Sequence, residues 1–145
     1  MLLKSSILAL ARSCAMQRDR AAAPGSGEGL ERIYKAFLYS CAGFAFGLRT
    51  ERAIKQEFAL LVVGLPLALV VGTGAYERLA LALSLAAVLC IEFLNTAIEK
   101  LCDHVTPDRH DAIKAIKDMA SAACLCVQVG AGLIWLTVLA ARFGL

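Results

Sequence analysis

The first residues that could do chemistry are three polar side chains set in an apolar stretch. Glu92, Asn95 and Glu99 are spaced i, i+3 and i+7, so on an α-helix their side chains fall within about 60° of one another. Asp103 extends the same stripe. At 1.5 Å per residue, Glu92 and Glu99 would lie about 10 Å apart along the axis. One metal ion could not bind both, so the spacing favours a deep general base and a shallower cation ligand.

Charged residues of both signs lie at the ends of the neighbouring apolar stretches. Lys114, Lys117 and Ser121 share one helical face, and Asp118 adjoins Lys117. Glu51 precedes another apolar stretch. Carboxylates suit a divalent cation and lysines suit phosphate, and phosphoryl transfer needs both. The sequence has no GxxxxGK[ST] loop, so a nucleotide would be held by side chains at the membrane surface.

Plainer roles for the same residues stay open. Glu92 could pair with a Lys or Arg of another subunit and only fix assembly. Lys117 and Asp118 could form a charge pair at a helix start, and Glu51 could be a solvated charge in a first helical turn. The loop from Cys102 to Asp111 holds Cys, Asp and His, but structural zinc sites use tighter spacing.

Three long apolar runs must position these residues. They contain a single charge, Glu92, and they cover residues 58–76, 79–98 and 119–141. Each reaches the ~20 residues that cross the hydrocarbon core of a bilayer. The chain is 59% hydrophobic, above the value of about half that is typical of soluble domains. We therefore predict an all-α membrane protein, with transmembrane helices at about 54–74, 78–102 and 113–142.

The segment before these spans divides into two parts. Apolar residues recur with a 3.6-residue period over residues 30–49, which predicts an amphipathic helix that lies on a membrane surface or packs on the bundle. Residues 1–29 are predicted to be an N-terminal extension that is disordered or has no assigned role. Residues 30–145 are predicted to form a single membrane domain.

Charge indicates orientation. Lys and Arg gather before the first span and between the second and third, so the positive-inside rule puts the N-terminus and the 100–117 loop in the cytoplasm. The carboxyl end then lies outside. The net charge of +3 is too weak to suggest a nucleic-acid partner.

Two segments resemble signatures of the prokaryotic diacylglycerol kinases. Residues 92–99, EFLNTAIE, are similar to E-x-x-N-[ST]-A-x-E. Residues 117–123, KDMASAA, are similar to K-D-x-[AG]-[AS]-[AG]-A. Residues 49–57 resemble the stretch before the first span of that family. The resemblance covers about residues 31–144, in order and without large gaps.

The resemblance implies a homotrimer in the bacterial inner (cytoplasmic) membrane, with a surface helix and three membrane helices in each subunit. It implies transfer of the ATP γ-phosphate to the hydroxyl of diacylglycerol, giving phosphatidic acid, with Mg²⁺ as cofactor. The active site would lie at the cytoplasmic interface, shared between subunits. A related class phosphorylates undecaprenol. Residues 55–57, KQE, favour the diacylglycerol type, whereas residues 49–52, RTER, are common to both.

The resemblance also implies roles by motif position. Glu92 would be the catalytic base, Glu51 and Glu99 would hold the metal, and Asn95 would support the site. The implied ATP-binding set is Arg32, Tyr39, Glu51, Glu99, Asp108, Arg109, His110, Lys117 and Asp118. The implied substrate-binding set is Arg32, Glu92 and Ser121.

A different class stays open beside the enzyme. In a non-enzymatic channel or assembly subunit, Glu92 would be a relay or pairing residue. A proton path would need polar side chains through the outer half of the membrane. There, spans one and three offer few polar residues apart from Gln128 and Thr137. Three helices are expected to hide Glu92 poorly on their own, so we also expect oligomerisation on physical grounds.

Overall fold

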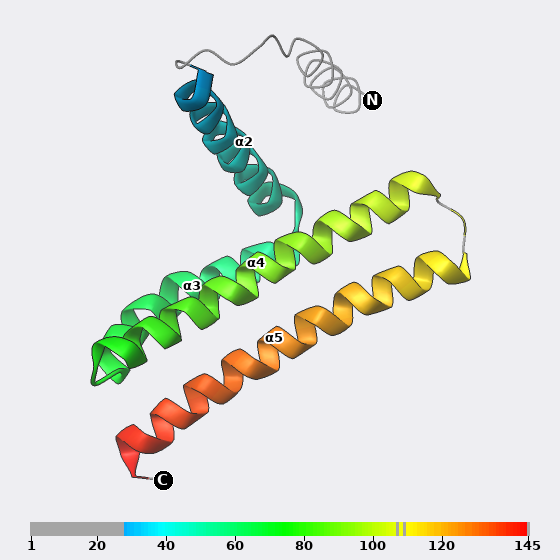
Figure 1. Cartoon of the computed structure of the whole chain (residues 1–145). Helices are drawn as coiled ribbons and strands as arrows, with labels where there is room; N and C mark the ends of the chain where they lie inside the picture. The colour runs from blue at the N-terminus through cyan, green and yellow to red at the C-terminus, as the bar shows by residue number, and fades with distance from the viewer. Residues whose placement is uncertain (1–27, 107, 109, 145) are drawn as a thin grey trace. The chain divides into compact units, whose positions relative to one another are not determined.

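The chain is all-helical wherever it is described. The computed structural model describes residues 28–106, 108 and 110–144. In these residues the chain forms four α-helices (Figure 1): α2 (Glu28–Thr50), α3 (Arg52–Val71), α4 (Ala75–Val105) and α5 (Asp111–Phe143). By length and composition, α3, α4 and α5 can each cross a membrane. This confirms the all-α fold with three membrane-spanning helices.

The helix ends differ from the predicted ends by short segments. Helix α2 begins at Glu28, so the last two residues of the predicted extension are helical. The rest of that extension, residues 1–27, lies outside the described residues. Helix α3 ends at Val71 rather than near residue 74, and α4 runs from Ala75 to Val105 rather than from 78 to 102.

The turn between α3 and α4 explains where these two helices stop and start. The Gly72 N–H donates to the Ala68 carbonyl at 3.0 Å, and Arg78 Nε donates to the Gly72 carbonyl at 2.9 Å. The Glu77 carboxylate accepts hydrogen bonds from the Thr73 N–H at 2.7 Å and from its hydroxyl at 2.8 Å. These bonds satisfy backbone groups that helix ends leave free. The turn therefore fits within residues 72–74, and α4 begins directly after it.

The loop between α4 and α5 is also held by local bonds. The Asp108 N–H donates to Thr106 Oγ1 at 3.2 Å. His110 is the N-cap of α5, and its Nδ1 accepts from the Ala112 N–H at 3.3 Å. These contacts end α4 and start α5. The loop lies at the end of α4 opposite to the α3–α4 turn (Figure 1).

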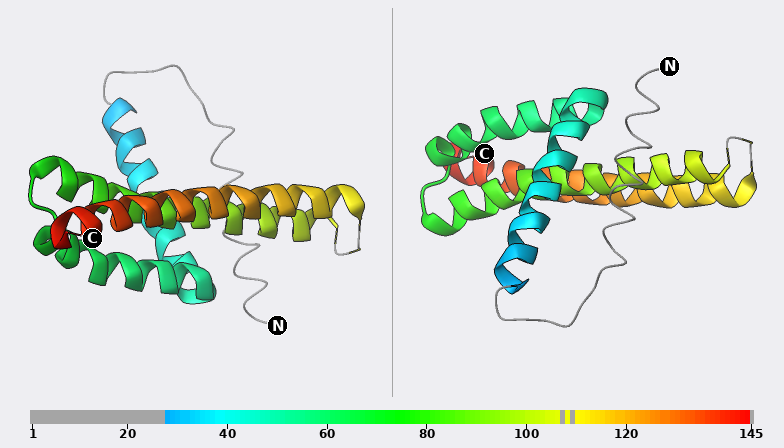
Figure 2. Two further views of the ribbon diagram at one scale, coloured as in Figure 1. Left: turned by 90° about the horizontal axis from the view of Figure 1, so that it is seen from below. Right: turned by 90° about the horizontal axis from the view of Figure 1, so that it is seen from above.

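Helix α4 is the middle helix of the bundle. It packs against both α3 and α5, which touch each other much less. Figures 1 and 2 show α4 and α5 running side by side in opposite directions. Near the α3–α4 turn all three helices share a core of Ala68, Val71 and Leu81, against which Trp135, Val138 and Leu139 pack.

Two glycines allow close approach to α4. A Cβ added at Gly64 would lie 2.5 Å from Cδ1 of Leu85, and one added at Gly47 would lie 2.6 Å from Cε1 of Phe93. The Phe93 ring also stacks on Phe44, with ring centroids 5.3 Å apart. Both α3 and the last turns of α2 are thereby held against α4.

The chain separates into two compact units, residues 1–41 and 42–145. In the first unit the described residues form the opening turns of α2. There Lys35 Nζ pairs with Glu31 Oε1 at 2.6 Å. The same turns expose large apolar side chains, among them Leu30, Ile33, Tyr34 and Phe37.

Candidate active site

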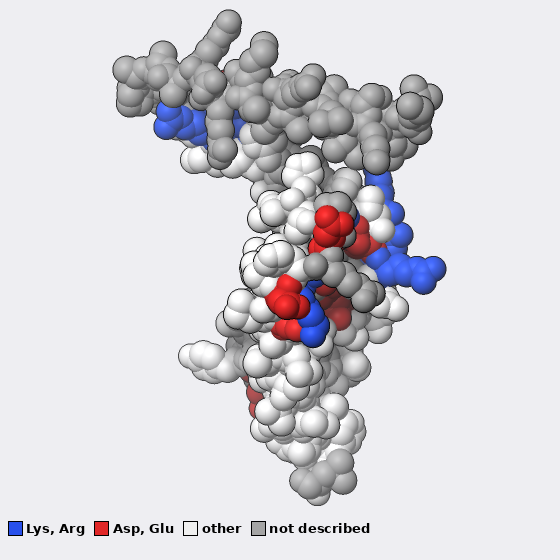
Figure 3. All heavy atoms as spheres, turned by 90° about the vertical axis from the view of Figure 1, so that its right-hand side faces the viewer, with Lys and Arg blue, Asp and Glu red and all other residues white. Residues whose placement is uncertain are grey.

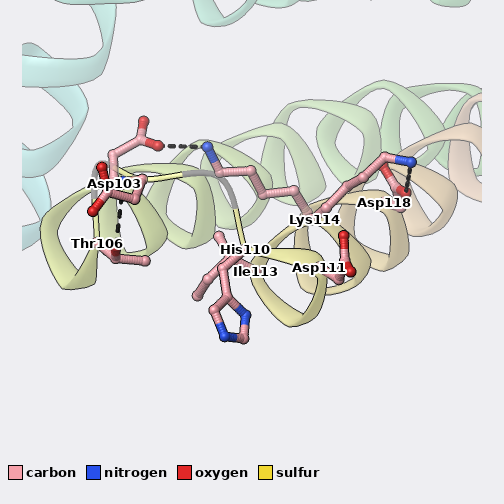
Figure 4. A pocket seen from close by; sticks show the side chains of 9 residues that line it. Asp103, Thr106, His110, Asp111, Ile113, Lys114 and Asp118 are labelled. Carbon is pink, nitrogen blue, oxygen red and sulfur yellow. Dashed lines mark hydrogen bonds and ion pairs between the residues drawn. The ribbon is translucent and has the colours of Figure 1, made fainter.

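A charged cavity of about 560 Å³ lies where α4 meets α5 at their connecting loop. Figure 4 shows Asp103 and Thr106 on the α4 side of this cavity, with Lys114 reaching Asp118 on the α5 side. Figure 3 views the molecule from the side of this loop and shows acidic and basic side chains close together. The residues that line the charged cavity are Asp103, Thr106, Asp108, His110, Asp111, Ile113, Lys114, Lys117 and Asp118.

Two ion pairs order this charged cavity. Lys117 Nζ lies 2.5 Å from Oδ1 of Asp103, and Lys114 Nζ lies 3.9 Å from Oδ2 of Asp118. The alternative in which Lys117 and Asp118 pair with each other is therefore wrong. The start of α5 adds the partial positive charge of a helix N-terminus. The lining also carries the carboxylates of Asp103, Asp108, Asp111 and Asp118, so a phosphate chain could bind only if a lysine left its aspartate or a cation came with the phosphates.

A second cavity, of about 500 Å³, follows along the same two helices. It brings together four residues that the sequence singled out: Glu92, Asn95, Asp118 and Ser121. Its other lining residues are Ala122, Cys124, Leu125 and Gln128. Asp118 lines both this cavity and the charged one, so the two spaces meet at its side chain.

Glu92 is already covered within one chain. It is 9% exposed, and none of the ion pairs within the described residues includes it. The expectation that three helices hide this residue poorly is wrong, because α4 is the middle helix and is covered from two sides. Glu92 therefore lies within the bundle and lines the second cavity without an ion-pair partner among the described residues.

An apolar groove continues from the second cavity towards the middle of the bundle. It measures about 480 Å³ and shares Gln128 with that cavity. Oε2 of Glu57 and Nε1 of Trp135 are both buried without a hydrogen-bond partner, which is unusual for buried polar atoms. The lining residues are Glu57, Leu60, Gly64, Leu67, Leu85, Val88, Gln128, Ala131, Gly132 and Trp135.

Gln128 and Glu57 were not among the residues predicted for the site. A signal for Gln128 was present, because Ser121, Cys124 and Gln128 are spaced i, i+3 and i+7, like the stripe on α4. Glu57 had no such signal, since its partners across the groove come from α4 and α5.

The stripe on α4 is held by its own hydrogen bond. Nδ2 of Asn95 donates to Oε1 of Glu99 at 3.2 Å, which their i, i+4 spacing on one helical face allows. Oδ1 of Asn95 is buried and has no partner, and Asn95 lines the cavity with Glu92. Glu99 is exposed. Asn95 is thus bonded to the accessible carboxylate, and it lines the same cavity as the covered one.

Glu51 is paired rather than freely solvated. Its Oε1 lies 2.6 Å from Nζ of Lys100, and its side chain is 28% exposed. The hydrogen bond from Lys100, followed by one from Thr50, lowers the pKa of Glu51 below its usual value. The alternative of a solvated first-turn charge is therefore wrong. Lys100 itself was missed, because its pairing joins α4 to the start of α3.

The carboxylates fit a magnesium ion that arrives with a nucleotide. Lys100 contacts Glu51 and directly follows Glu99 in the chain, so Glu51, the N-cap of α3, is tied to the turn of α4 that carries Glu99. Within residues 28–106, 108 and 110–144, no group of three or more His, Cys, Asp or Glu could hold a metal. Mg²⁺ uses one or two carboxylates together with substrate phosphates and water, so two glutamates suffice. The zinc alternative for the loop finds no support in this part of the chain.

The other predicted nucleotide residues have different places. Asp108 and His110 line the charged cavity. Arg32 and Tyr39 belong to the first unit, on the opening turns of α2. Arg109 lies outside the described residues.

The comparisons with known proteins agree with the resemblance. A family model described as prokaryotic diacylglycerol kinase matches residues 38–139. The chain is 38% identical over 111 residues to the diacylglycerol kinase of Pseudomonas aeruginosa, covering 77% of this chain and 90% of the relative. It is 33% identical over 116 residues to that of Escherichia coli strain K12, with 80% and 95% covered. For the Helicobacter pylori enzyme the values are 32% over 112 residues, with 77% and 88% covered.

The matched range includes both signature segments, residues 92–99 and 117–123. It also includes α3, α4 and most of α5, so the likeness covers the membrane helices and the cavities between them. The non-enzymatic channel or assembly subunit is therefore set aside. This chain belongs to the prokaryotic diacylglycerol kinase family and is a membrane-spanning lipid kinase of that family.

Proposed function

We propose that the protein transfers the γ-phosphate of ATP to the hydroxyl of diacylglycerol, giving phosphatidic acid and ADP. The observation that carries this proposal is the position of Asp118, which lines both the charged cavity and the cavity that holds Glu92. A phosphate donor in the first space and a lipid hydroxyl in the second would meet at this residue. Proximity of this kind is the main requirement of phosphoryl transfer.

ATP would bind in the charged cavity, which holds Lys114 and Lys117. Lys117 would exchange the carboxylate of Asp103 for phosphate oxygens. Asp108 and His110 line the same space. The family resemblance alone gives Arg32, Tyr39 and Arg109 a part in ATP binding. Magnesium, held by Glu51 and Glu99, would neutralise charge on the phosphates while they react.

Glu92 would act as the base on the lipid hydroxyl. Its carboxylate would accept the hydroxyl proton while the lipid oxygen forms a bond to the γ-phosphorus. The bond from that phosphorus to the bridging oxygen breaks, and ADP leaves. Asn95 and Ser121 line the same cavity and would orient the hydroxyl through hydrogen bonds.

The apolar groove would take a lipid chain. It continues from the Glu92 cavity through Gln128 and is lined mainly by Leu, Val, Ala and Gly. The relatives are named diacylglycerol kinases, which supports diacylglycerol as the acceptor. Undecaprenol is the alternative acceptor, since it offers the same hydroxyl on an apolar chain.

The protein would act as a homotrimer in the bacterial inner membrane, with the active site on the cytoplasmic side. The distribution of Lys and Arg supports this orientation. In α5 only 11% of the most apolar window is buried in the single chain. Its exposed small residues, among them Ala122 and Ala123, permit close contact between helices. The exposed apolar side chains on the opening turns of α2 suit a membrane surface.

The test is a competition assay with two lipids. Protein in mixed micelles receives radiolabelled ATP, diacylglycerol and undecaprenol together, and the lipid products are separated by thin-layer chromatography. We expect the label in phosphatidic acid. Label only in undecaprenyl phosphate would assign the other acceptor.

Glu92→Gln tests the base in the same assay. We expect kcat to fall by about 10²- to 10⁴-fold, which is the usual contribution of general-base catalysis, while circular dichroism and elution volume stay unchanged. Glu77→Gln is the matched control, because Glu77 lies on the same helix at the opposite end. Full activity of the Glu92→Gln enzyme would remove Glu92 as the base.

A further inference from the structure

Glu51 already holds a cation that belongs to the chain. The Lys100 ammonium lies 2.6 Å from Oε1 of Glu51 and 5.5 Å from the centre of the Phe46 ring. The Lys100 side chain is 47% exposed, so it can leave this position without unpacking the bundle. The Lys100 ammonium is therefore paired with Glu51, the carboxylate that would bind a metal ion in the proposed function.

We propose that Lys100 competes with the divalent cation for Glu51, so that the metal binds by displacing the ammonium. This inference rests on the proposed role of Glu51 as a metal ligand. An ammonium and a divalent cation in contact with one carboxylate would repel each other strongly. The two occupants of Glu51 are thus alternatives rather than neighbours.

The displacement costs little and leaves Lys100 in reach. Ion pairs between partly exposed side chains are weak, so a divalent cation can replace the ammonium. The Phe46 ring offers the released ammonium a second favourable contact. Because Lys100 directly follows Glu99, the ammonium stays at the turn that carries the other proposed ligand. Without metal, Lys100 holds the Glu51 side chain in place. Because the ammonium must be displaced, the metal concentration needed for half-maximal binding is higher than it would be without Lys100.

The experiment measures Mn²⁺ binding to the full chain in nanodiscs by electron paramagnetic resonance, with a non-hydrolysable ATP analogue at one fixed concentration, because the proposed ligands need substrate phosphates to complete the site. In Lys100→Met the dissociation constant for Mn²⁺ should fall by about two- to fivefold, the factor that a partly exposed ion pair contributes. Lys100→Arg keeps the pair, so its constant should equal or exceed that of the wild type. The free Mg²⁺ concentration for half-maximal activity should shift in the same direction as the Mn²⁺ constant.

Lys55→Met is the matched control for net charge. Lys55 acts on Glu51 through its charge, but it forms none of the ion pairs within the described residues. If contact is what matters, Lys55→Met should shift the Mn²⁺ constant less than Lys100→Met. Equal shifts in the two variants would overturn the competition.

Glu51→Gln tests the role of Glu51 as a metal ligand separately from its competition with Lys100. If this variant binds Mn²⁺ as the wild type does, the proposed metal ligand is wrong. If Glu51→Gln weakens Mn²⁺ binding but Lys100→Met leaves it unchanged or weaker, the competition is overturned and the metal ligand stands. Lys100→Met removes the ammonium that competes for Glu51, so this variant should bind Mn²⁺ at least as tightly as the wild type. If Lys100→Met binds no Mn²⁺, the competition is overturned.

Discussion

Lys117 and Asp118 are adjacent in the sequence but have different partners. Successive side chains on a helix point about 100° apart, so Lys117 meets Asp103 across the loop while Asp118 lies near Lys114 on its own helix. Lys117 therefore lines only the charged cavity, whereas Asp118 lines both cavities. In the proposed function, Lys117 would contact the phosphate donor, and Asp118 would lie where the donor and the lipid hydroxyl meet.

Lys117→Met should weaken nucleotide use more than lipid use. The variant removes an ammonium from the charged cavity and leaves Asp103 without its partner, so phosphate meets more negative charge. We expect KM for ATP to rise about tenfold or more, since a charge-assisted hydrogen bond contributes ~1.5–3 kcal/mol, with KM for the lipid nearly unchanged. Steady-state kinetics with each substrate varied in turn would measure this.

Lys114→Met is the control for Lys117→Met, because the Lys114 side chain is 78% exposed and its pair is the longer one. Its effect on KM for ATP should be smaller. A rise confined to the lipid KM in Lys117→Met would contradict the placement of ATP in the charged cavity.

The helices position the cavities through their contacts with α4. Gly64 lets α3 lie close to Leu85, and Gly47 lets the end of α2 lie close to Phe93. Helix α4 extends past the start of α3 and meets α5 at the loop (Figure 1). The charged cavity therefore belongs to α4, α5 and their loop, whereas the apolar groove involves all three membrane helices.

Gly132→Leu should narrow the apolar groove. Gly132 lines the groove, and a Cβ added there would meet nothing within 4 Å, so a larger side chain can enter the space that a lipid chain would use. We expect KM for long-chain diacylglycerol to rise more than KM for a short-chain analogue, because the short chain needs less of the groove. KM values for both lipids would be compared in mixed micelles.

Gly130→Leu is the matched control for the groove. A Cβ at Gly130 also meets nothing within 4 Å, but Gly130 is not a lining residue of the groove. It should affect long and short chains alike. Equal effects of Gly132→Leu on both lipids would argue against a chain in the groove.

The whole chain combines a covered carboxylate, the proposed base Glu92, with membrane helices that remain largely uncovered. Glu92 is buried without any partner subunit, so its burial is no reason for oligomerisation. The remaining reason is α5, whose most apolar window is largely uncovered. Lipid can cover such a surface, but small residues favour a neighbouring helix there.

Native mass spectrometry of the protein released from detergent micelles should count three chains. The exposed face of α5 would form the proposed subunit contact, because its small residues allow close packing. The activity should elute with the three-chain species on size exclusion. A fully active monomer would contradict the homotrimer.

The sequence by itself determined the membrane helices and the chemical types of the site. Crossing a bilayer demands about 20 apolar residues, and the helical period puts Glu92, Asn95 and Glu99 on one face. Both are properties of a single segment, so they can be read without knowing its neighbours. The Asn95–Glu99 hydrogen bond is their direct consequence.

Only the tertiary structure decided which residues meet across helices. Lys117 pairs with Asp103, Lys100 pairs with Glu51, and α4 is covered on two sides so that Glu92 is buried. These outcomes depend on how far each helix is rotated and shifted against the next. Close contacts such as Gly64 with Leu85 set that rotation and shift, and the period of one helix does not contain this information.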